Sequence, residues 1–321
     1  MNVLITGGAG FIGSHLVRRL VLAHNASITV LDNFHRGRRG SLADFFSEIR
    51  VLEADVRDID SLVEALSGID LVYHLAAQSS VISADEDLNY TFSTNVAGTF
   101  NLLRAAKSNG VRRVVFTSSR EVYGDPSGLP VPETAPIRPK NAYGASKAAG
   151  EAYCGAFGTD GLEVAVLRLA NVYGPGDSGR VLPLFVESAL QDRPLVLYGG
   201  QQILDFVWID NVIAALVKVG FGDLIPEPLN VGSGKGIVIS GLARRVVEAT
   251  DSRSRIEIVR CRHAEVTRFV ADVTRATQMI GLQQPKDPLF GLTELVEHAR
   301  RQISLSQDGA LVVGASAANG A

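Results

Sequence analysis

A tyrosine and a lysine stand four residues apart in the run Tyr143-Gly144-Ala145-Ser146-Lys147. Positions i and i+4 of a helix share one face, so the phenol and the ammonium point the same way. A nearby cation favours the ionised form of a phenol, whose ordinary pKa is about 10. Tyr143 and Lys147 are therefore candidates for a general base and its supporting cation. Because such pairs also occur by chance, this prediction depends on the motifs around it.

A glycine-rich turn lies between an apolar strand-like run and a helical pattern at the start of the chain. Gly7, Gly10 and Gly13 recur at every third position. Glycine lets such a turn tighten and lets the backbone approach a pyrophosphate, which then lies at the helix N-terminus, where free N–H groups favour anions. The strand, turn and helix context predicts a dinucleotide site.

Carboxylates follow the next two strand-like runs. Asp32 lies about 20 residues beyond the glycine turn, where a carboxylate accepts the adenosine ribose hydroxyls and repels a 2′-phosphate, so NAD is favoured over NADP. The nearby Arg36, Arg38 and Arg39 are interpreted as a solvated loop, with a phosphate site for NADP as the alternative. Asp55 is predicted to touch the adenine, and a simple turn carboxylate is an equal alternative.

Short β-branched runs alternate with longer helical patterns in the first half of the chain. The predicted strands are 3–6, 28–31, 49–53, 71–74, 114–117 and 164–169, and the predicted helices are 11–22, 89–108 and 142–157. Near-continuous apolar strands indicate a parallel sheet buried on both faces. The fold class is therefore α/β, with a Rossmann-type doubly wound parallel sheet whose ligands lie at the carboxyl ends of the strands.

The second half is less regular and predicts a smaller, partly interleaved C-terminal substrate domain. We expect residues 1–173 to form the NAD-binding domain, with a return of the chain at about 205–232. Residues 174–204 and 233–303 are assigned to the substrate-binding domain. The small and polar segment 304–321 is predicted to be a flexible tail.

Composition narrows the classes of partner. The 321 residues include 31 Lys and Arg and 34 Asp and Glu, which give a net charge of −3 and no reason to expect nucleic acid. No apolar stretch approaches the roughly 20 residues of a membrane helix, and no signal peptide is recognised, so we expect a soluble, cytoplasmic protein without a membrane partner. The two cysteines have no metal-type spacing, and no metal site is predicted.

Seven motifs, taken in order, resemble one known family. They are the glycine turn, Asp32, His74-Leu75-Ala76-Ala77-Gln78, Asn95 in Asn95-Val96-Ala97-Gly98-Thr99, the cluster at Ser119, the Tyr143 and Lys147 pair, and Arg168-Leu169-Ala170-Asn171-Val172-Tyr173-Gly174. Together they resemble the extended short-chain dehydrogenase/reductases and, more narrowly, the NAD-dependent nucleotide-sugar epimerase/dehydratase group. The resemblance runs from about residue 2 to residue 300.

The resemblance implies a tightly held NAD that accepts hydride from C4 of a sugar while Tyr143 removes the hydroxyl proton. It implies that Lys147 holds the nicotinamide ribose and lowers the tyrosine pKa, and that Ser119 hydrogen-bonds the sugar 4-oxygen. The cofactor-binding residues implied are Gly7, Gly10, Phe11, Ile12, Gly13, Asp32, Asn33, Asp55, Val56, Leu75, Ala76, Ala77, Asn95, Tyr143 and Lys147.

The run Ser119-Arg120-Glu121 bears on the reaction that follows C4 oxidation. In the 4,6-dehydratases of this family the three positions read Thr, Asp and Glu, and an arginine at the second position cannot donate the proton that the aspartate gives. Simple 4-epimerases carry small residues there, so Glu121 is a further catalytic candidate. Nucleotide-uronate decarboxylases also have a glutamate there, and Arg120 could then pair with a C6 carboxylate. The alternative is that both side chains pair with other protein groups or with solvent.

The residues that would hold the substrate depart from the family at one position. Leu204 replaces an arginine that elsewhere holds the diphosphate, whereas Asn171 and Arg262 match phosphate-contacting residues. Arg180 and Arg268 are the candidates to compensate. The leading hypothesis is an NAD-dependent 4-epimerase of a nucleotide sugar. The alternatives are a dehydratase or decarboxylase that uses Glu121, and a non-catalytic NAD sensor. By resemblance we expect a homodimer that pairs through the helix 89–108 and the helix that carries Tyr143.

Overall fold

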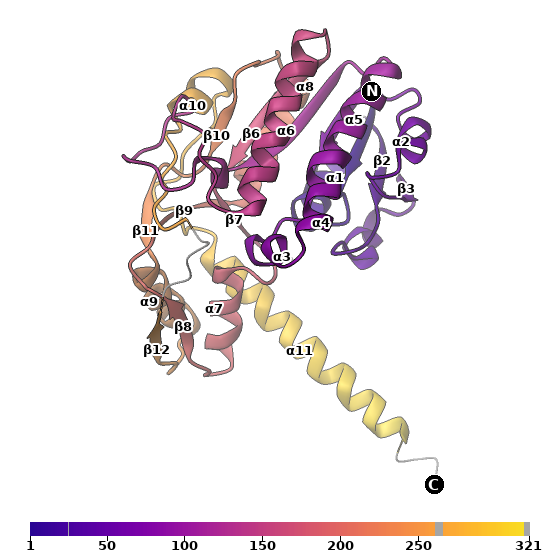
Figure 1. Cartoon of the computed structure of the whole chain (residues 1–321). Coiled ribbons are helices and arrows are strands. Elements are labelled where there is room, and N and C mark those ends of the chain that lie inside the picture. Colours follow the sequence, from indigo (N-terminus) through magenta and orange to yellow (C-terminus); the bar gives the residue numbers. More distant parts are fainter. Residues whose placement is uncertain (25, 261–265, 318–321) are drawn as a thin grey trace.

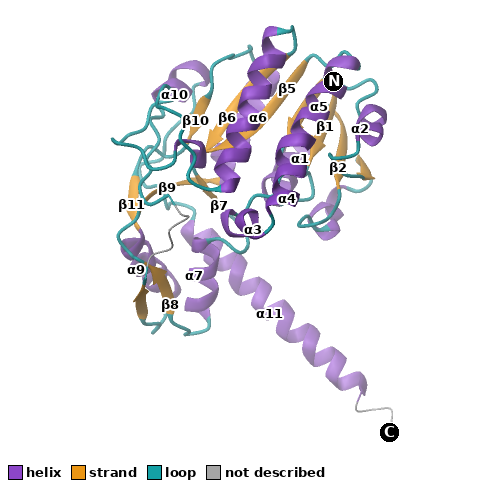
Figure 2. Cartoon of the chain, viewed as in Figure 1, coloured by secondary structure: helices purple, strands orange, loops and turns teal. Residues whose placement is uncertain are grey.

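The computed structural model describes residues 1–24, 26–260 and 266–317, of which 306–317 are described as backbone only. Seven parallel strands form the central sheet in the order β10-β6-β5-β4-β1-β2-β3 (Figure 1 and Figure 2). The strands are β1 (Asn2–Thr6), β2 (Ser27–Asp32), β3 (Ile49–Glu53), β4 (Leu71–His74), β5 (Arg113–Ser119), β6 (Glu163–Leu169) and β10 (Leu229–Val231). This order confirms the predicted doubly wound sheet, which reverses direction between β1 and β4.

Helices cover both faces of the sheet because the strands are apolar on both sides. On β1, Val3 and Ile5 point into one buried cluster with α1 (Phe11–Ala23) and α8 (Ile209–Phe221). Leu4 points into the other cluster. That cluster contains residues of α2 (Ile59–Ala65), α5 (Gly98–Ser108) and α6 (Ala142–Thr159). The two apolar clusters pack against opposite faces of the sheet. They keep the parallel strands aligned, so that the carboxyl ends of the strands lie at one edge of the sheet.

The helix predicted over 89–108 is formed in three joined parts. After α3 (Val81–Glu86), the chain is helical through α4 (Leu88–Thr91), a π-helical segment (Phe92–Ala97) and α5. A π-helical turn inside an α-helix is uncommon and frequent at functional sites. Here it carries Asn95, one of the predicted cofactor residues, to the carboxyl end of β4.

Two small sheets lie beyond β6. One contains β7 (Asn171–Tyr173), β9 (Ile203–Trp208) and β11 (Gly236–Val238), and the other contains β8 (Leu195–Tyr198) and β12 (Ile256–Val259). They pack with α7 (Val181–Leu190) and α9 (Ile239–Thr250), while α10 (Thr274–Ile280) lies near β10 and α8. These strands are only three to six residues long, so the apolar pattern of the sequence did not predict them individually.

Trp208 joins the small three-stranded sheet to the last helix. It ends β9, is 4% exposed, and lies with its ring 5.1 Å from that of Tyr173 and 5.9 Å from that of Phe290. A Cβ on Gly291 would lie 2.3 Å from the indole, so the chain passes it closely before α11 (Leu292–Ala317) begins.

α11 continues as helix to Ala317 and extends away from the body of the protein (Figure 1), and the flexibility predicted for 304–321 stays a prediction. The segment 304–317 contains no proline to end a helix that is already nucleated by packing at its start. Residues 318–321 lie outside the described residues. In the described part of the chain, no helix is both long and apolar enough to cross a membrane.

Candidate active site

The glycine turn lies at the reversal point of the sheet, beside the loop that follows β4. Gly7 has φ +70°, and a Cβ on it would lie 2.7 Å from the backbone nitrogen of Ala76. A Cβ on Gly13 would lie 2.3 Å from the carbonyl oxygen of Gly7. Because these atoms lie so close together, a side chain does not fit at Gly7 or Gly13. The helix α1 begins at Phe11, and its first backbone N–H groups are available to bind an anion.

A cavity of about 970 Å³ opens over this turn. Its wall includes the glycine turn and Asp32 on one side, the loop after β4 in the middle, and α7 and the start of α11 on the far side. Of the predicted cofactor residues, it is lined by Gly7, Gly10, Phe11, Ile12, Gly13, Asp32, Asn33, Val56, Leu75, Ala76 and Ala77. The volume and the backbone cradle fit a bound dinucleotide.

Asp32 ends β2 with both carboxylate oxygens held by backbone amides. Its Oδ2 accepts from the Ala9 N–H at 2.9 Å and its Oδ1 accepts from the Phe34 N–H at 2.8 Å. Burial raises the pKa of this carboxyl, and the two amide hydrogen bonds oppose that shift. The carboxylate is thereby oriented at the place where a ribose would lie, with lone pairs left to accept its hydroxyls.

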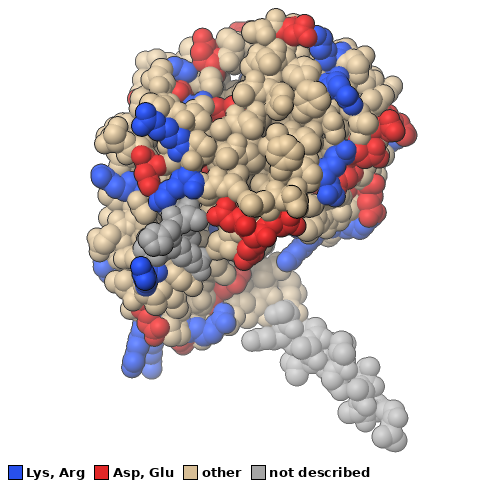
Figure 3. Space-filling view, in the orientation of Figure 1, with Lys and Arg blue, Asp and Glu red and all other residues tan. Residues whose placement is uncertain are grey.

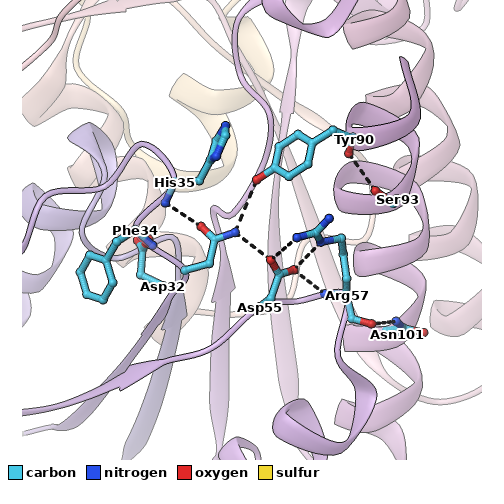
Figure 4. A network of polar contacts seen from close by, with 9 residues as sticks. Asp32, Phe34, His35, Asp55, Arg57, Tyr90, Ser93 and Asn101 are labelled. Carbon is cyan, nitrogen blue, oxygen red and sulfur yellow. Dashed lines mark hydrogen bonds and ion pairs between the residues drawn. The ribbon is translucent and has the colours of Figure 1, made fainter. Parts of the chain in front are cut away.

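A polar network beside Asp32 forms the next part of the wall (Figure 4). The Asn33 amide donates to Asp55 at 2.8 Å and to the Tyr90 hydroxyl at 3.4 Å, and Arg57 donates to both oxygens of Asp55. Burial disfavours the Asp55 carboxylate, but the Arg57 and Asn33 hydrogen bonds outweigh it and lower its pKa to about 2. Tyr90 was missed by the sequence analysis because a lone tyrosine on a helical pattern gives no signal.

Asn95 lies one layer behind the wall of the cavity. It is 1% exposed, its Oδ1 accepts from the Gln78 N–H at 2.7 Å, and its amide donates to the Ser146 hydroxyl at 2.9 Å. Asn95 therefore ties the loop after β4 to α6. The direct contact with the cofactor that the resemblance implies stays a prediction, and the contacts of this side chain in the structure are with Gln78 and Ser146.

Ser119, Tyr143 and Lys147 come together at the carboxyl end of β5. The Ser119 hydroxyl acts on the Tyr143 phenol as a hydrogen-bonding group and lowers its pKa. The Lys147 ammonium donates to the Thr117 carbonyl oxygen at 2.8 Å and lies 6.0 Å from the centre of the Tyr143 ring. Asn141 caps the N-terminus of α6 by accepting from the Gly144 N–H, which starts the helix directly before Tyr143.

Burial shifts the pKa values of Tyr143 and Lys147, both on α6, in the directions that disfavour their ionised forms. It raises the pKa of Tyr143, and the charge of Arg180, the Ser119 hydrogen bond and the charge of Arg120 oppose that rise. It lowers the pKa of Lys147 to about 8. Among the described residues, the cations whose charges interact with the phenol are Arg180, Arg120 and Arg36 rather than Lys147, to which the resemblance assigns that effect.

Arg120 and Glu121 form a buried ion pair in the 3-10 turn Arg120–Tyr123. Arg120 Nη2 lies 2.9 Å from Glu121 Oε1, and the Asn141 amide donates to Glu121 Oε2 at 2.7 Å. Both carboxylate oxygens of Glu121 are therefore engaged by protein donors. The structure supports the alternative in which the two side chains pair within the protein.

The predicted substrate residues are divided between the cavity and the core. Arg180 lines the cavity, lies 5.8 Å from the Phe11 ring centre and pairs with Asp177 at 2.6 Å. The Asn171 amide donates to the Asp205 carbonyl oxygen at 2.9 Å, and Leu204 is buried in the core. Arg262 lies outside the described residues.

Comparisons with known proteins agree with this geometry. The model of the NAD dependent epimerase/dehydratase family matches residues 3–232. A UDP-glucose 4-epimerase of Mycolicibacterium smegmatis is 34% identical, with 94% of this chain and 99% of that protein covered. UDP-glucuronic acid decarboxylase 2 of Arabidopsis thaliana is 32% identical, with 94% and 69% covered.

A solved structure shows the same architecture with the cofactor in place. It is the UDP-glucose 4-epimerase of Thermus thermophilus in complex with NAD, which is 33% identical, with a TM-score of 0.87 and 94% of this chain and 99% of that chain covered. The family match covers well over half of the chain and includes the glycine turn, Asp32, Ser119 and Tyr143. The chain therefore belongs to the NAD-dependent epimerase/dehydratase family, whose members are enzymes that use NAD.

Proposed function

We propose that this enzyme is a 4-epimerase of a nucleotide sugar. One observation carries the proposal: Glu121 is held by Arg120 and Asn141, so Ser119, Tyr143 and Lys147 form the reactive set. Those three groups are sufficient for reversible oxidation at a carbinol carbon. A further acid or base at C5 or C6 is needed only for elimination or decarboxylation.

The side chains divide the work at C4 as follows. Ser119 holds the 4-oxygen, and Tyr143 accepts the hydroxyl proton as the C4–H bond breaks. Lys147, fixed by the Thr117 carbonyl, would hold the nicotinamide ribose, and the positive charges of Arg180 and Arg120 favour the ionised phenol. Bound NAD supplies the reversible hydride transfer. Return of the proton from Tyr143 to the 4-oxygen accompanies reduction on the opposite face, which inverts C4.

A dehydratase or decarboxylase that uses Glu121 is the second candidate. The likeness to a UDP-glucuronic acid decarboxylase of Arabidopsis thaliana favours it, as does the presence of a carboxylate next to Ser119. In that reaction Glu121 would have to leave Arg120 and Asn141 before it acted on the sugar. The additional cost of breaking a buried ion pair makes this the weaker proposal.

We propose that α7, α9, β8, β11 and β12, which lie within the predicted ranges 174–204 and 233–303, form the substrate-binding part. Arg180 lines the cavity and its charge acts on Tyr143, so it is our candidate for the substrate diphosphate. The buried Leu204 cannot make that contact.

The test is turnover of a panel of UDP-, dTDP- and GDP-hexoses and UDP-glucuronate, with mass spectrometry and proton NMR as the readouts. A product of unchanged mass with an inverted C4 proton supports the proposal. Loss of water or of carbon dioxide as the main reaction would overturn it and assign Glu121 a chemical role.

We also propose a homodimer that pairs through α5 and α6. The outer side of α6 exposes small apolar residues and Tyr153, and its two charged residues, Lys147 and Glu151, are turned inward. Leu88 and Phe92 are 61% and 63% exposed on the neighbouring helical segment. The middle of this face carries few charged side chains (Figure 3). An exposed apolar patch of this kind is typical of an interface.

A further inference from the structure

Arg120 is buried but has an unused hydrogen-bond donor. The residue is 9% exposed, and its Nη2 pairs with Glu121. Its Nη1 is fully buried and finds no hydrogen-bond partner among the described residues. Buried donors of a charged group are nearly always satisfied, because an unmet donor loses its hydration without compensation. The arrangement therefore indicates a partner that arrives from outside the chain.

The free donor belongs to the reaction centre. Arg120 follows Ser119 directly, and the 3-10 turn places its guanidinium 6.0 Å from the centre of the Phe269 ring. The charges of Arg120 and Glu121 both act on the Tyr143 hydroxyl. In a sugar whose 4-oxygen lies between Ser119 and Tyr143, the C5 substituent stands on the carbon next to C4, close to the side chains that surround these two residues.

Other buried polar atoms without partners have different chemistry. Thr94 Oγ1 and Gln78 Oε1 are neutral, and Asp177 Oδ2 belongs to a carboxylate already paired with Arg180. Arg120 is the one cation in that set of described residues. A cationic planar donor prefers an anionic planar acceptor, and a carboxylate is the best match.

We propose that Arg120 is a specificity-determining residue that receives a carboxylate on C5 of the sugar, so that the preferred substrate is a nucleotide uronate rather than a neutral nucleotide hexose. This inference rests on the proposed C4 epimerisation. Arg120 then bridges two carboxylates, with Nη2 on Glu121 and Nη1 on the substrate.

The same contact bears on the fate of the oxidised sugar. A uronate with a ketone at C4 is a β-keto acid: its C5–C6 bond can break, the electron pair passes through C5 to the C4 oxygen, carbon dioxide leaves, and C5 later takes a proton. The negative charge moves from C6 to the C4 oxygen in that step. Arg120 stabilises the charge on the carboxylate before the step, so it opposes the loss of carbon dioxide and favours return to the C4 alcohol.

The experiment compares UDP-glucuronate with UDP-glucose as substrates of the NAD-loaded protein. We expect kcat/KM to favour the uronate by roughly 10- to 100-fold, the ratio that one charge-assisted hydrogen bond provides. In the double variant Arg120→Gln with Glu121→Gln, which keeps the buried pair neutral, the ratio should fall to near one. Arg193→Gln removes an exposed arginine and should leave the ratio unchanged.

Binding measured without turnover gives a second readout. In a Tyr143→Phe background, calorimetric titration should show tighter binding of UDP-glucuronate than of UDP-glucose, and Arg120→Lys should reduce that difference because one ammonium cannot serve both carboxylates in fork geometry. Arg120→Lys also serves if the double variant does not fold. With Tyr143 intact, carbon dioxide release from UDP-glucuronate should rise in both the double variant and Arg120→Lys.

Different results would overturn the uronate inference and the epimerase proposal. C4 isomers formed from neutral and acidic sugars at equal kcat/KM, or a ratio that survives the loss of Arg120, would overturn the uronate inference and leave the epimerase proposal standing. Absence of a C4 isomer from every sugar in the panel would overturn the epimerase proposal, and the uronate inference with it.

Discussion

The neighbours of Glu121 determine whether its carboxylate can act as an acid or base in the reaction. In this chain both of its oxygens accept from protein donors, Arg120 and Asn141. We predict that Glu121→Gln lowers kcat for C4 epimerisation by less than about tenfold, since no proton transfer depends on it. Single-turnover rates with the NAD-loaded variant measure this. A loss of several orders of magnitude would indicate that Glu121 acts as an acid or base.

Tyr143 should behave in the opposite way. Removal of its hydroxyl in Tyr143→Phe takes away the only proposed proton acceptor, so we expect kcat to fall by roughly 10²- to 10⁴-fold while NAD stays bound. Tyr153→Phe on the same helix is the matched control, because Tyr153 is 38% exposed and points away from the cavity wall. Equal losses in both variants would argue against the assignment.

Lys147 links the site to the pH dependence of stability. Burial lowers its pKa to about 8 in the folded protein, against about 10.4 in an unfolded chain. Between these values the unfolded state binds more protons, so this group makes the free energy of unfolding rise with pH from about 8 to 10.4. Below pH 8 it contributes no slope.

The matched variant is Lys147→Met, which has no titratable group at that position. Denaturant unfolding of the cofactor-free protein from pH 7 to pH 10.5 should show the rise in the parent and its loss in the variant. Parallel curves for the two proteins would show that Lys147 titrates normally.

At the scale of elements, the glycine turn depends on contacts that a single methyl group would break. In Gly13→Ala the new Cβ would lie 2.3 Å from the Gly7 carbonyl oxygen, so the turn and α1 must separate, and we expect NAD affinity to fall by at least about tenfold with a loss of stability. Titration with NAD and thermal unfolding measure both effects.

Gly158→Ala is the control for that variant, since a Cβ there meets nothing within 4 Å. It lies inside α6, where alanine is favoured over glycine by about 1 kcal/mol, so its stability should rise and its NAD affinity should not change. A similar loss of affinity in both variants would contradict the role of the turn.

Periodicity and motif spacing predicted the elements of the first half because those signals are local. The runs at 3–6 and 71–74 became neighbouring strands β1 and β4, and Tyr143 and Lys147 lie on one helix as their spacing required. The pairing of Arg120 with Glu121 was not predictable in this way. Adjacent residues of a strand point to opposite faces, and only the 3-10 turn and the cap Asn141 bring these side chains together.

At the scale of the whole molecule, the apolar face of α5 and α6 predicts the oligomeric state. Phe92→Asp places a charge where the proposed interface would bury it, so we expect light scattering to give the mass of one chain for the variant and of two for the parent. Leu22→Asp is the control, since Leu22 is 69% exposed on the opposite face. A parent that is already monomeric would refute the dimer.

The remaining parts of the molecule depend on contacts between distant segments, which a single sequence does not reveal. The Asn33, Asp55 and Tyr90 network joins three elements separated by up to 57 positions. Asn95 was assigned to the cofactor from its motif, yet its contacts are with Gln78 and Ser146. In both cases the residue types were informative and their partners were set by tertiary packing.

Trp208 is the single tryptophan of the chain, and its place between Tyr173, Phe290 and the start of α11 has a practical consequence. Ultraviolet emission excited at the red edge of the absorption band comes from this one indole. Its wavelength and intensity therefore report whether the last helix is docked on the small sheet. Stopped-flow mixing of the unlabelled protein with nucleotide sugars would then follow that junction in real time.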